Sequence, residues 1–270
     1  HDALPIWFIM ERINATTGSY NFIDLFAGAG GLSEGFIRCG FEPIAHVEMN
    51  KDACDTLRTR TAFHYLKEEN RIEEYYDYVK GKISRDELWL KIPEHLIKSV
   101  INTEISPETL PSIFGKIDKQ LGKQKVDLVI GGPPCQSWSE AGSKRGIADK
   151  RGQLFYDFIR ILKAKKPSFF LAENVSGMLA ERHKSALDQI KKTFEDAGYD
   201  LHFKLLNATD YGIAQDRKRV IFLGFRKDLN VHYTFPEPIV KKLVLKDIIK
   251  DLEDKAVPAI NKSKPNPLAI

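Results

Sequence analysis

A cysteine follows two glycines and two prolines in the segment Asp127–Cys135. The preceding apolar run, Val126–Ile130, is typical of a buried strand. Because proline fixes φ and lacks an amide N–H, the chain must leave the sheet just before the thiol. A free cysteine is usually a small buried hydrophobic residue, and we interpret Cys39 and Cys54 in that way. A polar loop follows Cys135 and no amphipathic pattern surrounds it, so we predict that this thiol is presented as a nucleophile.

The segment Phe22–Leu32 contains three glycines, Gly28, Gly30 and Gly31, between an apolar run and a helical pattern. Such glycines let the backbone approach a ligand closely, and the amide groups at a helix start favour its polar or anionic part. A dinucleotide fingerprint would need glycine at position 33, where the chain has Ser33. A dehydrogenase is therefore disfavoured.

Two acidic residues follow predicted strands: Glu48 follows Pro43–Val47, and Glu173 follows Ser168–Ala172. Open α/β folds bind ligands at the carboxyl edge of the sheet, where both carboxylates are expected. Glu48, next to the glycine segment, could accept hydrogen bonds from both hydroxyls of a ribose. Glu173, next to the strand that carries Cys135, could share or donate a proton. The alternative for both residues is an acidic helix cap.

A basic run, Gln215–Arg219, opens the predicted strand Val220–Phe225. Alternation along a strand places Gln215, Arg217 and Arg219 on one face. Guanidinium groups that point toward a pocket can bind a base carbonyl or phosphates and stabilise a thiolate. The alternative is a solvated basic surface.

Short apolar runs that alternate with helical patterns are expected to position these residues. We predict an α/β fold with a doubly wound, mostly parallel sheet and helices on both faces. The strands are expected at Phe22–Phe26, Pro43–Val47, Val126–Ile130, Ser168–Ala172, Leu201–Leu206 and Val220–Phe225, and the helices at Leu32–Cys39, Asp52–Tyr65, Leu154–Ala164 and His183–Ala197.

Two segments interrupt this alternation. Residues 67–107 are charged and aromatic, with helical spacing near Arg85–Val100, and we interpret them as an elaborated crossover. Residues 137–152 are rich in Gly, Ser, Lys and Arg, which favours a mobile active-site loop. The expected organisation is an N-terminal extension (1–20), a catalytic and cofactor-binding domain (21–235) and the start of a proline-bearing linker (236–270).

Composition places this chain of 270 residues, 43% hydrophobic and 29% charged, among ordinary globular proteins. No apolar run approaches the roughly 20 residues that a membrane-spanning helix needs. The N-terminus shows no secretory leader, so we expect a cytoplasmic protein, associated with the nucleoid if the source is a prokaryote. The three cysteines form no CxxC pair, which disfavours a disulfide framework and a cysteine zinc site. A net charge of +4 is compatible with phosphate-bearing partners but does not select them.

Taken together, these segments resemble the ordered motifs of the DNA (cytosine-5) methyltransferase family, over about residues 21–225. The most specific part is Pro-Pro-Cys-Gln, Glu-Asn-Val and Gln-x-Arg-x-Arg, in this order and at strand ends. The resemblance implies a Rossmann-like S-adenosylmethionine-dependent methyltransferase fold. The matching segments are Phe26–Gly31, Glu48, Pro133–Gln136, Arg151–Phe155, Glu173–Val175, Asn207–Gly212 and Gln215–Arg219.

By this resemblance the cofactor is S-adenosylmethionine, the product is S-adenosylhomocysteine and no metal is used. The family has an aspartate after its third strand that binds the adenine amino group, and Glu104 stands in the matching stretch here. The implied cofactor-binding residues are Phe26, Ala27, Gly28, Gly30, Gly31, Leu32, Glu48, Met49, Glu104, Ile105, Pro134 and Leu154.

The family's chemistry assigns roles to the remaining residues. Cys135 would add to carbon 6 of cytosine and make carbon 5 nucleophilic. Glu173 would bind ring N3 and the exocyclic amine, and Arg219, with Arg217, would contact the O2 carbonyl. The cytosine must be flipped out of duplex DNA, and the loop 137–152 would close over it. The residues expected to contact DNA or belong to that loop are Gln136, Ser137, Ser139, Arg151, Asn174 and Gln215.

The family's arginine-bearing return helix and Gly-Asn motif do not occur before Ile270. Target recognition is therefore expected from a further segment or a partner subunit, in a bacterial restriction-modification or epigenetic setting. Two alternatives stay open: an RNA (tRNA) cytosine-C5 methyltransferase, and a catalytic subunit that is inactive without its partner. We favour DNA because the Cys-Phe-Thr signature of the RNA-specific members is missing from the sequence.

Overall fold

A computed structural model of the protein describes residues 19–134, 154–239 and 243–252. The predicted nucleophile Cys135 and the predicted loop 137–152 lie outside these ranges. The chain divides into two compact units. The larger unit comprises the described part of His1–Leu205 together with Arg219–Pro236, and the smaller comprises Leu206–Lys218 together with the described part of Glu237–Ile270.

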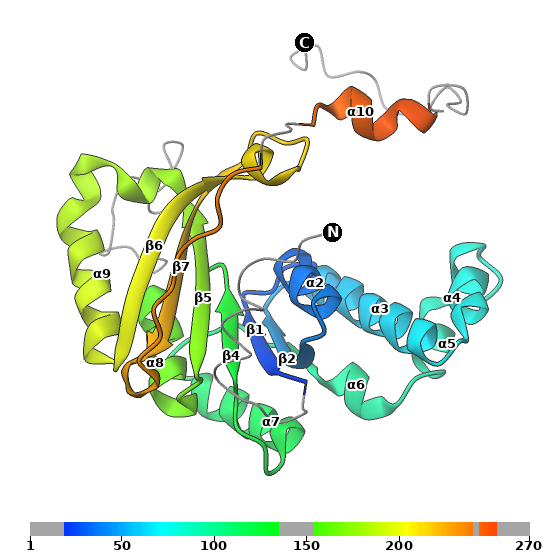
Figure 1. Ribbon diagram of the computed structural model, residues 1–270. Helices are drawn as coiled ribbons and strands as arrows, with labels where there is room; N and C mark the ends of the chain where they lie inside the picture. Colours follow the sequence, from blue (N-terminus) through cyan, green and yellow to red (C-terminus); the bar gives the residue numbers. More distant parts are fainter. Residues whose placement is uncertain (1–18, 135–153, 240–242, 253–270) are drawn as a thin grey trace, which may run out of the picture. The chain divides into compact units, whose positions relative to one another are not determined.

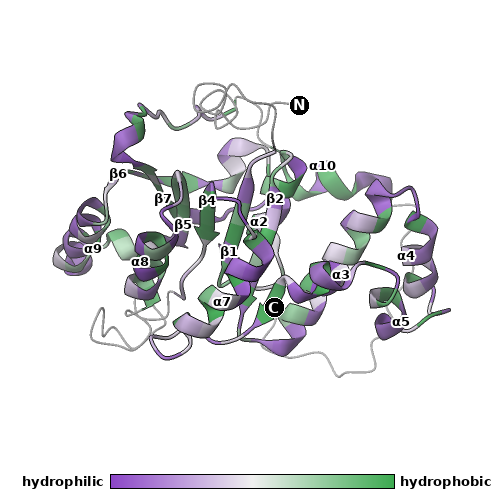
Figure 2. Ribbon diagram, turned by 90° about the horizontal axis from the view of Figure 1, so that it is seen from below, coloured by the Kyte–Doolittle hydropathy of each residue, from purple (hydrophilic) through white to green (hydrophobic). Residues whose placement is uncertain are grey.

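One seven-stranded sheet forms the centre of the larger unit, in the order β3-β2-β1-β4-β5-β7-β6 (Figure 1). The first five strands of this order are parallel to their neighbours, and β7 runs antiparallel to β5. Strand β4 is hydrophobic along its length and β1 in its larger part (Figure 2), and both strands are buried throughout, as expected for strands covered on both faces. The strands are β1 (Asn21–Leu25), β2 (Glu42–Glu48), β3 (Val100–Asn102), β4 (Leu128–Gly131), β5 (Phe169–Val175), β6 (Tyr199–Asn207) and β7 (Lys218–Arg226).

Helices cover both faces of the sheet, which confirms the predicted doubly wound, mostly parallel α/β fold. Helix α2 packs through Phe36 with Phe22 of β1 on one face. Helices α7, α8 and α9 pack with Ile23 and Leu25 of the same strand on the other face. The helices are α2 (Gly31–Arg38), α3 (Lys51–Glu68), α4 (Ile72–Val79), α5 (Arg85–Trp89), α6 (Glu94–Lys98), α7 (Leu110–Leu121), α8 (Leu154–Lys165), α9 (Lys184–Asp196) and, in the smaller unit, α10 (Leu245–Ile249).

The crossover from β2 to β3 carries four helices, α3 to α6, and a small core of its own that includes Leu66 and Leu88. The residue pattern predicts helical spacing near Arg85–Val100, but the helical part ends at Lys98 and strand β3 begins at Val100. Val100 pairs with β2, and this tertiary pairing determines the strand. Neither β3 nor α7 was identified from sequence.

The cysteines outside the predicted site differ from each other. Cys54 is fully buried, as predicted, but Cys39 is exposed, so its interpretation as a buried hydrophobic residue was wrong. Cys39 is the C-cap residue of α2, at the surface end of that helix. In the described part of the chain, no helix is both long and apolar enough to span a membrane.

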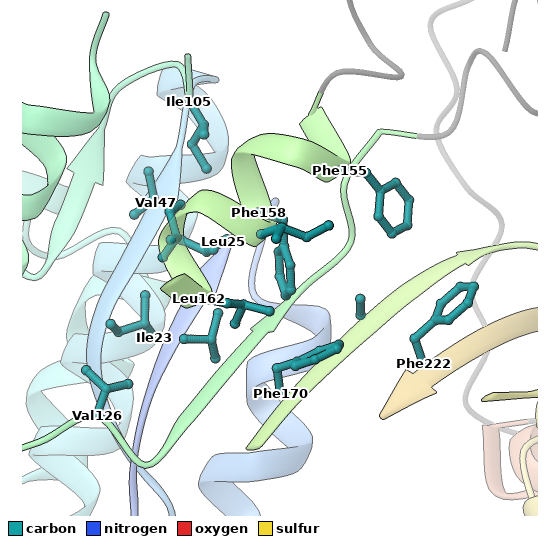
Figure 3. Close-up of a cluster of buried hydrophobic side chains, with 14 of the residues drawn as sticks. Ile23, Leu25, Val47, Ile105, Val126, Phe155, Phe158, Leu162, Phe170 and Phe222 are labelled. Carbon is teal, nitrogen blue, oxygen red and sulfur yellow. The ribbon is translucent and has the colours of Figure 1, made fainter. Parts of the chain in front are cut away.

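The main core lies between the sheet and helices α7, α8 and α9, and its side chains converge in Figure 3. Phe170 of β5 stacks on Phe194 of α9 with 4.6 Å between ring centroids, and Phe158 of α8 meets it edge-on at 5.8 Å. Burial of each such ring stabilises the fold by about 1.5–3 kcal/mol. This core holds β5, which carries Glu173, in place.

Gly224 of β7 lies opposite Phe170 in the β5–β7 pairing. A Cβ atom at Gly224 would lie 2.0 Å from Cε1 of Phe170, a ring that is fully buried between its neighbours. We therefore expect Gly224→Ala to lower the free energy of unfolding by about 1–3 kcal/mol, because the ring has no room to move. Urea unfolding followed by circular dichroism measures the change.

The matched control is Gly115→Ala, on an exposed position of α7 where an added Cβ meets no atom within 4 Å. Alanine favours a helix interior over glycine, so this variant is expected to gain up to about 1 kcal/mol. Equal effects of the two substitutions would contradict the packing explanation.

Candidate active site

The glycine segment forms a tight turn between β1 and α2. Phe26 has φ 56°, Gly28 has φ 53° and Gly30 has φ 84°, so three residues of the turn have left-handed backbone conformations. For a non-glycine residue such as Phe26 this conformation costs about 1–3 kcal/mol, and such strain is concentrated at functional sites. A Cβ atom on Gly28 or Gly31 would meet no atom within 4 Å, so the turn borders open space that a ligand can approach.

Glu48, the last residue of β2, binds this turn with one carboxylate oxygen and the start of α3 with the other. Oε2 accepts a hydrogen bond from the Gly28 amide at 2.9 Å, and Oε1 accepts one from the Asn50 amide at 2.8 Å. Asn50, not Glu48, caps α3, since its side chain accepts from the Ala53 amide. Each carboxylate oxygen keeps further acceptor capacity for ligand hydroxyl groups.

Asn102, at the end of β3, was missed by sequence reasoning. Its Nδ2 donates to the main-chain oxygens of Glu48 at 3.1 Å and Met49 at 2.9 Å. Cys54 Sγ also lies 3.3 Å from the Glu48 oxygen, so both side chains fix the end of β2. Asn102 could have been found only if β3 had been identified from the sequence, because that strand places Asn102 at the same sheet edge as Glu48. Met49, the next residue along the chain, is 66% exposed and offers an apolar surface to a ring.

Glu104 and Ile105 were predicted beside the adenine. Ile105 is buried in the main core, whereas Glu104 is exposed in the loop between β3 and α7. Its main-chain oxygen accepts a hydrogen bond from Thr109 Oγ1 at 2.6 Å. Both residues follow β3 at the carboxyl edge of the sheet.

Glu173 of β5 and Arg219 of β7 form an ion pair at the other half of this edge. Arg219 Nε lies 2.6 Å from Glu173 Oε1, and their side chains are 26% and 24% exposed. Glu173 lies inside β5, and Val175 is the residue before the following 3-10 helix, so the helix-cap alternative for Glu173 is not realised. The pair joins an acid to a planar, permanently charged donor.

The turn after β4 is fixed against this acid. A Cβ atom at Gly132 would lie 3.3 Å from Glu173 Oε2, so glycine gives the carboxylate room beside the turn. The buried Asn174 donates from Nδ2 to the Pro133 oxygen at 3.2 Å. The turn that leads into Pro134 and Cys135 is therefore tied to the end of β5.

The other predicted residues fall into three groups. Ala27 and Leu32 lie in the glycine turn and at the start of α2, and Leu154 is the first residue of α8. Gln215 and Arg217 belong to the smaller unit, where the Arg217 amide donates to Asn207 Oδ1 at 3.1 Å. Within the described ranges, no cluster of three or more His, Cys, Asp or Glu side chains is placed to hold a metal ion. The residues outside those ranges are Cys135, Gln136, Ser137, Ser139 and Arg151.

This arrangement, a glycine turn with a strand-end carboxylate and a second acid beside a Pro-Pro turn, has a counterpart among known proteins. The sequence matches the family of C-5 cytosine-specific DNA methylases over residues 20–85 and 106–267. The chain belongs to this family. The family resemblance noted from the sequence is thereby confirmed.

Among similar proteins, the type II methyltransferase M.NgoPII of Neisseria gonorrhoeae is 42% identical over 264 residues, which cover 95% of this chain and 65% of that protein. The type II methyltransferase M.FnuDI of Fusobacterium nucleatum is 47% identical over 247 residues, which cover 90% of this chain and 59% of that protein. The chain thus spans about 60% of the length of these relatives.

A solved structure shows the same fold as this chain. A prophage-encoded DNA modification methyltransferase of E. coli is 26% identical, with a TM-score of 0.58, and the match covers 86% of this chain and 54% of that one. The predicted Rossmann-like methyltransferase fold is therefore confirmed.

Proposed function

We propose that the protein transfers a methyl group from S-adenosylmethionine to carbon 5 of a flipped-out cytosine in duplex DNA, through a covalent Cys135 adduct. One observation carries this proposal: the Glu173–Arg219 ion pair lies at the sheet edge, and Glu173 borders the turn that leads into Pro134-Cys135. The type II methyltransferases among its relatives support a role in restriction-modification.

The glycine turn and the ends of β2 and β3 fit S-adenosylmethionine. The glycine turn borders open space, the Glu48 carboxylate has spare acceptor capacity for two ribose hydroxyls, and Met49 offers an exposed apolar surface to the adenine. Phe26 follows β1, and Asn102 and the stretch with Glu104 and Ile105 lie at the end of β3; these two strands flank β2, which carries Glu48. When bound, this cofactor supplies the transferred methyl group.

The Glu173–Arg219 pair beside the Pro-Pro turn fits a cytosine ring. Cytosine carbon 5 is a poor nucleophile, and addition of the Cys135 thiolate to carbon 6 makes it enamine-like. Glu173 would hold ring N3 and the exocyclic amine, and would stabilise the charge that develops on the ring. Arg219 would donate to the O2 carbonyl. After methyl transfer, loss of the carbon 5 proton re-forms the double bond and expels Cys135 as thiolate.

Contacts with DNA are assigned by the family resemblance. The flipped cytosine must leave the base stack to reach Glu173. Contact with the DNA or closure over the cytosine is assigned to Gln136, Ser137, Ser139, Arg151, Asn174 and Gln215. Arg217 would contact the O2 carbonyl together with Arg219. Because the chain spans about 60% of its relatives' length, recognition of a target sequence is assigned to a further segment or a partner subunit.

The proposed substrate is tested by parallel methyl-transfer assays. Radiolabelled S-adenosylmethionine is incubated with duplex DNA and with transfer RNA, using protein that includes its complete recognition segment. Label is expected in DNA, and bisulfite sequencing of a methylated plasmid then identifies the cytosine. Transfer to RNA alone would replace DNA by RNA in the proposal.

Glu48→Gln is expected to weaken S-adenosylmethionine binding by about 10–100-fold. Hydrogen bonds to a charged group are worth about 1.5–3 kcal/mol, and the glutamine NH₂ group would also face an amide donor, that of Gly28 or Asn50. Isothermal titration calorimetry measures the dissociation constant.

The matched control is Glu42→Gln, an exposed acid at the opposite end of β2 that interacts with Ser19. This variant is expected to bind the cofactor as tightly as the wild type. A Glu48→Gln protein with unchanged affinity would remove Glu48 from the cofactor site.

A further inference from the structure

Asp24 of β1 is a buried acid to which neither the sequence nor the proposed mechanism assigns a role. It lies two residues before Phe26, is 1% exposed, and its Oδ2 has no hydrogen-bond partner among the described residues. A buried carboxylate without a compensating partner is costly, and each such group in a native structure requires an explanation.

The groups around Asp24 do not favour a negative charge. The Ser33 hydroxyl of α2 lies near its carboxyl group, Glu48 of β2 adds a second acid nearby, and His46 is its partner in the β1–β2 pairing. On its other side, Asp24 pairs with the apolar Ile130 of β4. Burial, with a smaller effect of Glu48 and an opposing effect of Ser33, raises the pKa of Asp24 to about 8.

No ion pair joins a described basic side chain to Asp24. His46 is 3% exposed, and burial, reinforced by Arg60, lowers its pKa to about 4, so it is neutral above that pH. Arg60 of α3 is paired with Glu34 of α2. The charges of Arg60 and Glu34 thus compensate each other, and neither neutralises a carboxylate at Asp24.

The protonation state of Asp24 determines whether the Ser33 hydroxyl can donate to the Gly30 oxygen in the glycine turn. Ser33 Oγ lies 3.2 Å from the Gly30 oxygen, and a hydroxyl has only one proton to donate. An uncharged Asp24 can donate to Ser33, which leaves the serine proton for Gly30. An ionised Asp24 only accepts, so the serine proton turns to it and the bond to Gly30 is lost.

We propose that Asp24 is a positioning residue of the cofactor site, which holds the glycine turn through Ser33 and Gly30 as an uncharged carboxyl group. This role rests on the proposed function, because the turn is the assigned cofactor loop. Gly30 is closely surrounded by side chains, since a Cβ atom there would lie 2.9 Å from Leu57 Cδ2 and 3.3 Å from Ser33 Oγ. A change at Ser33 therefore reaches the backbone that borders the cofactor.

A cavity gives solvent access to this cluster. Its volume is about 350 Å³, and its lining includes Ser33, His46 and Arg60. Protons can therefore reach the neighbours of Asp24 from solvent, and the carboxyl group can titrate in the folded protein.

The proposal predicts a specific pH dependence of cofactor affinity. If binding requires uncharged Asp24, the competent fraction falls about tenfold between pH 7 and pH 9 for a pKa near 8, and the dissociation constant rises by the same factor. Asp24→Asn keeps a donor to Ser33 at every pH. Wild-type protein should therefore lose about ten times more affinity over this range than Asp24→Asn does.

The test is titration of S-adenosylmethionine into wild type, Asp24→Asn and Ser33→Ala between pH 6.5 and 9. Titration of the ligand itself is common to all three proteins and cancels in the comparison. Ser33→Ala should bind several-fold more weakly at pH 7 and should lack the extra loss at pH 9. The control is Asp55→Asn: although burial acts to raise it, Lys51 and Arg85 hold the pKa of Asp55 low, so this substitution should leave the pH dependence unchanged.

A second measurement needs no cofactor. Since the pKa of Asp24 is raised on folding, the folded state holds a proton between pH 4 and 8 that the unfolded state releases, and stability falls as pH rises through this window. Asp24→Asn should remove this part of the slope, with unfolding by urea as the readout.

The outcomes separate the two proposals. Parallel pH curves of binding for wild type and Asp24→Asn would overturn the positioning role, as would loss of binding at pH 7 in a folded Asp24→Asn protein. Failure of the wild type to bind S-adenosylmethionine at pH 7, with the pH slope of stability still present, would instead overturn the cofactor assignment.

Discussion

Replacement of Cys135 by serine is expected to abolish methyl transfer, with a rate loss on the order of 10⁴-fold or more, as for other nucleophile deletions. A serine hydroxyl at neutral pH holds almost no alkoxide, whereas a thiol supplies a reactive thiolate. Affinity for S-adenosylmethionine should stay within about twofold, because the glycine turn and Glu48 are on other strands. Label transfer to duplex DNA and calorimetric titration of the cofactor measure the two effects.

A duplex with 5-fluorocytosine at the target position gives a direct readout of the covalent step. Fluorine on carbon 5 cannot leave as a proton does, so the adduct with Cys135 persists and runs as a larger band on a denaturing gel. Cys39→Ser is the matched control, since Cys39 is exposed at the end of α2. It should form the adduct normally, and adduct formation by Cys135→Ser would exclude the assigned nucleophile.

The strands that carry the site could be predicted from sequence because they are nearly continuous apolar runs. Burial on both faces produces that pattern in β1, β4 and β5, and it places Glu173 and the Pro-Pro turn at the carboxyl edge. Strand β3 has only three residues, Val100–Asn102, and follows the short helix α6 directly. Such a strand has no periodicity of its own, and pairing with β2 alone identifies it.

Within the site, sequence gave the residue types at strand ends but not their partners. The glycine turn and Glu48 were both assigned to the cofactor, yet the bond between the Gly28 amide and Glu48 Oε2 depends on the β1–β2 register. The same holds for Asp24, which reads as one acid within an apolar strand. Its burial and its contact with Ser33 depend on how α2 packs, and no local pattern encodes that.

Glu173→Gln is expected to lower kcat for methyl transfer by about 10²–10³-fold, with a much smaller effect on KM for DNA. A glutamine side chain can still donate to ring N3 and accept from the exocyclic amine, so it retains much of the ground-state binding. It cannot supply a proton or a charge as electron density builds on the ring. Steady-state kinetics with complete protein and duplex substrate give both constants.

The Glu173–Arg219 pair provides the control for this prediction. Because both side chains are about a quarter exposed, loss of the ion pair should change the free energy of unfolding by no more than about 1 kcal/mol. Arg219→Lys keeps the charge but loses the planar donor, and should lower kcat on its own. If the acid and the guanidinium stabilise the same transition state, the double variant Glu173→Gln/Arg219→Lys loses less activity than the product of the single losses. Multiplicative losses would mean that the two residues act independently on the transition state, and that the ion pair between them contributes nothing to catalysis.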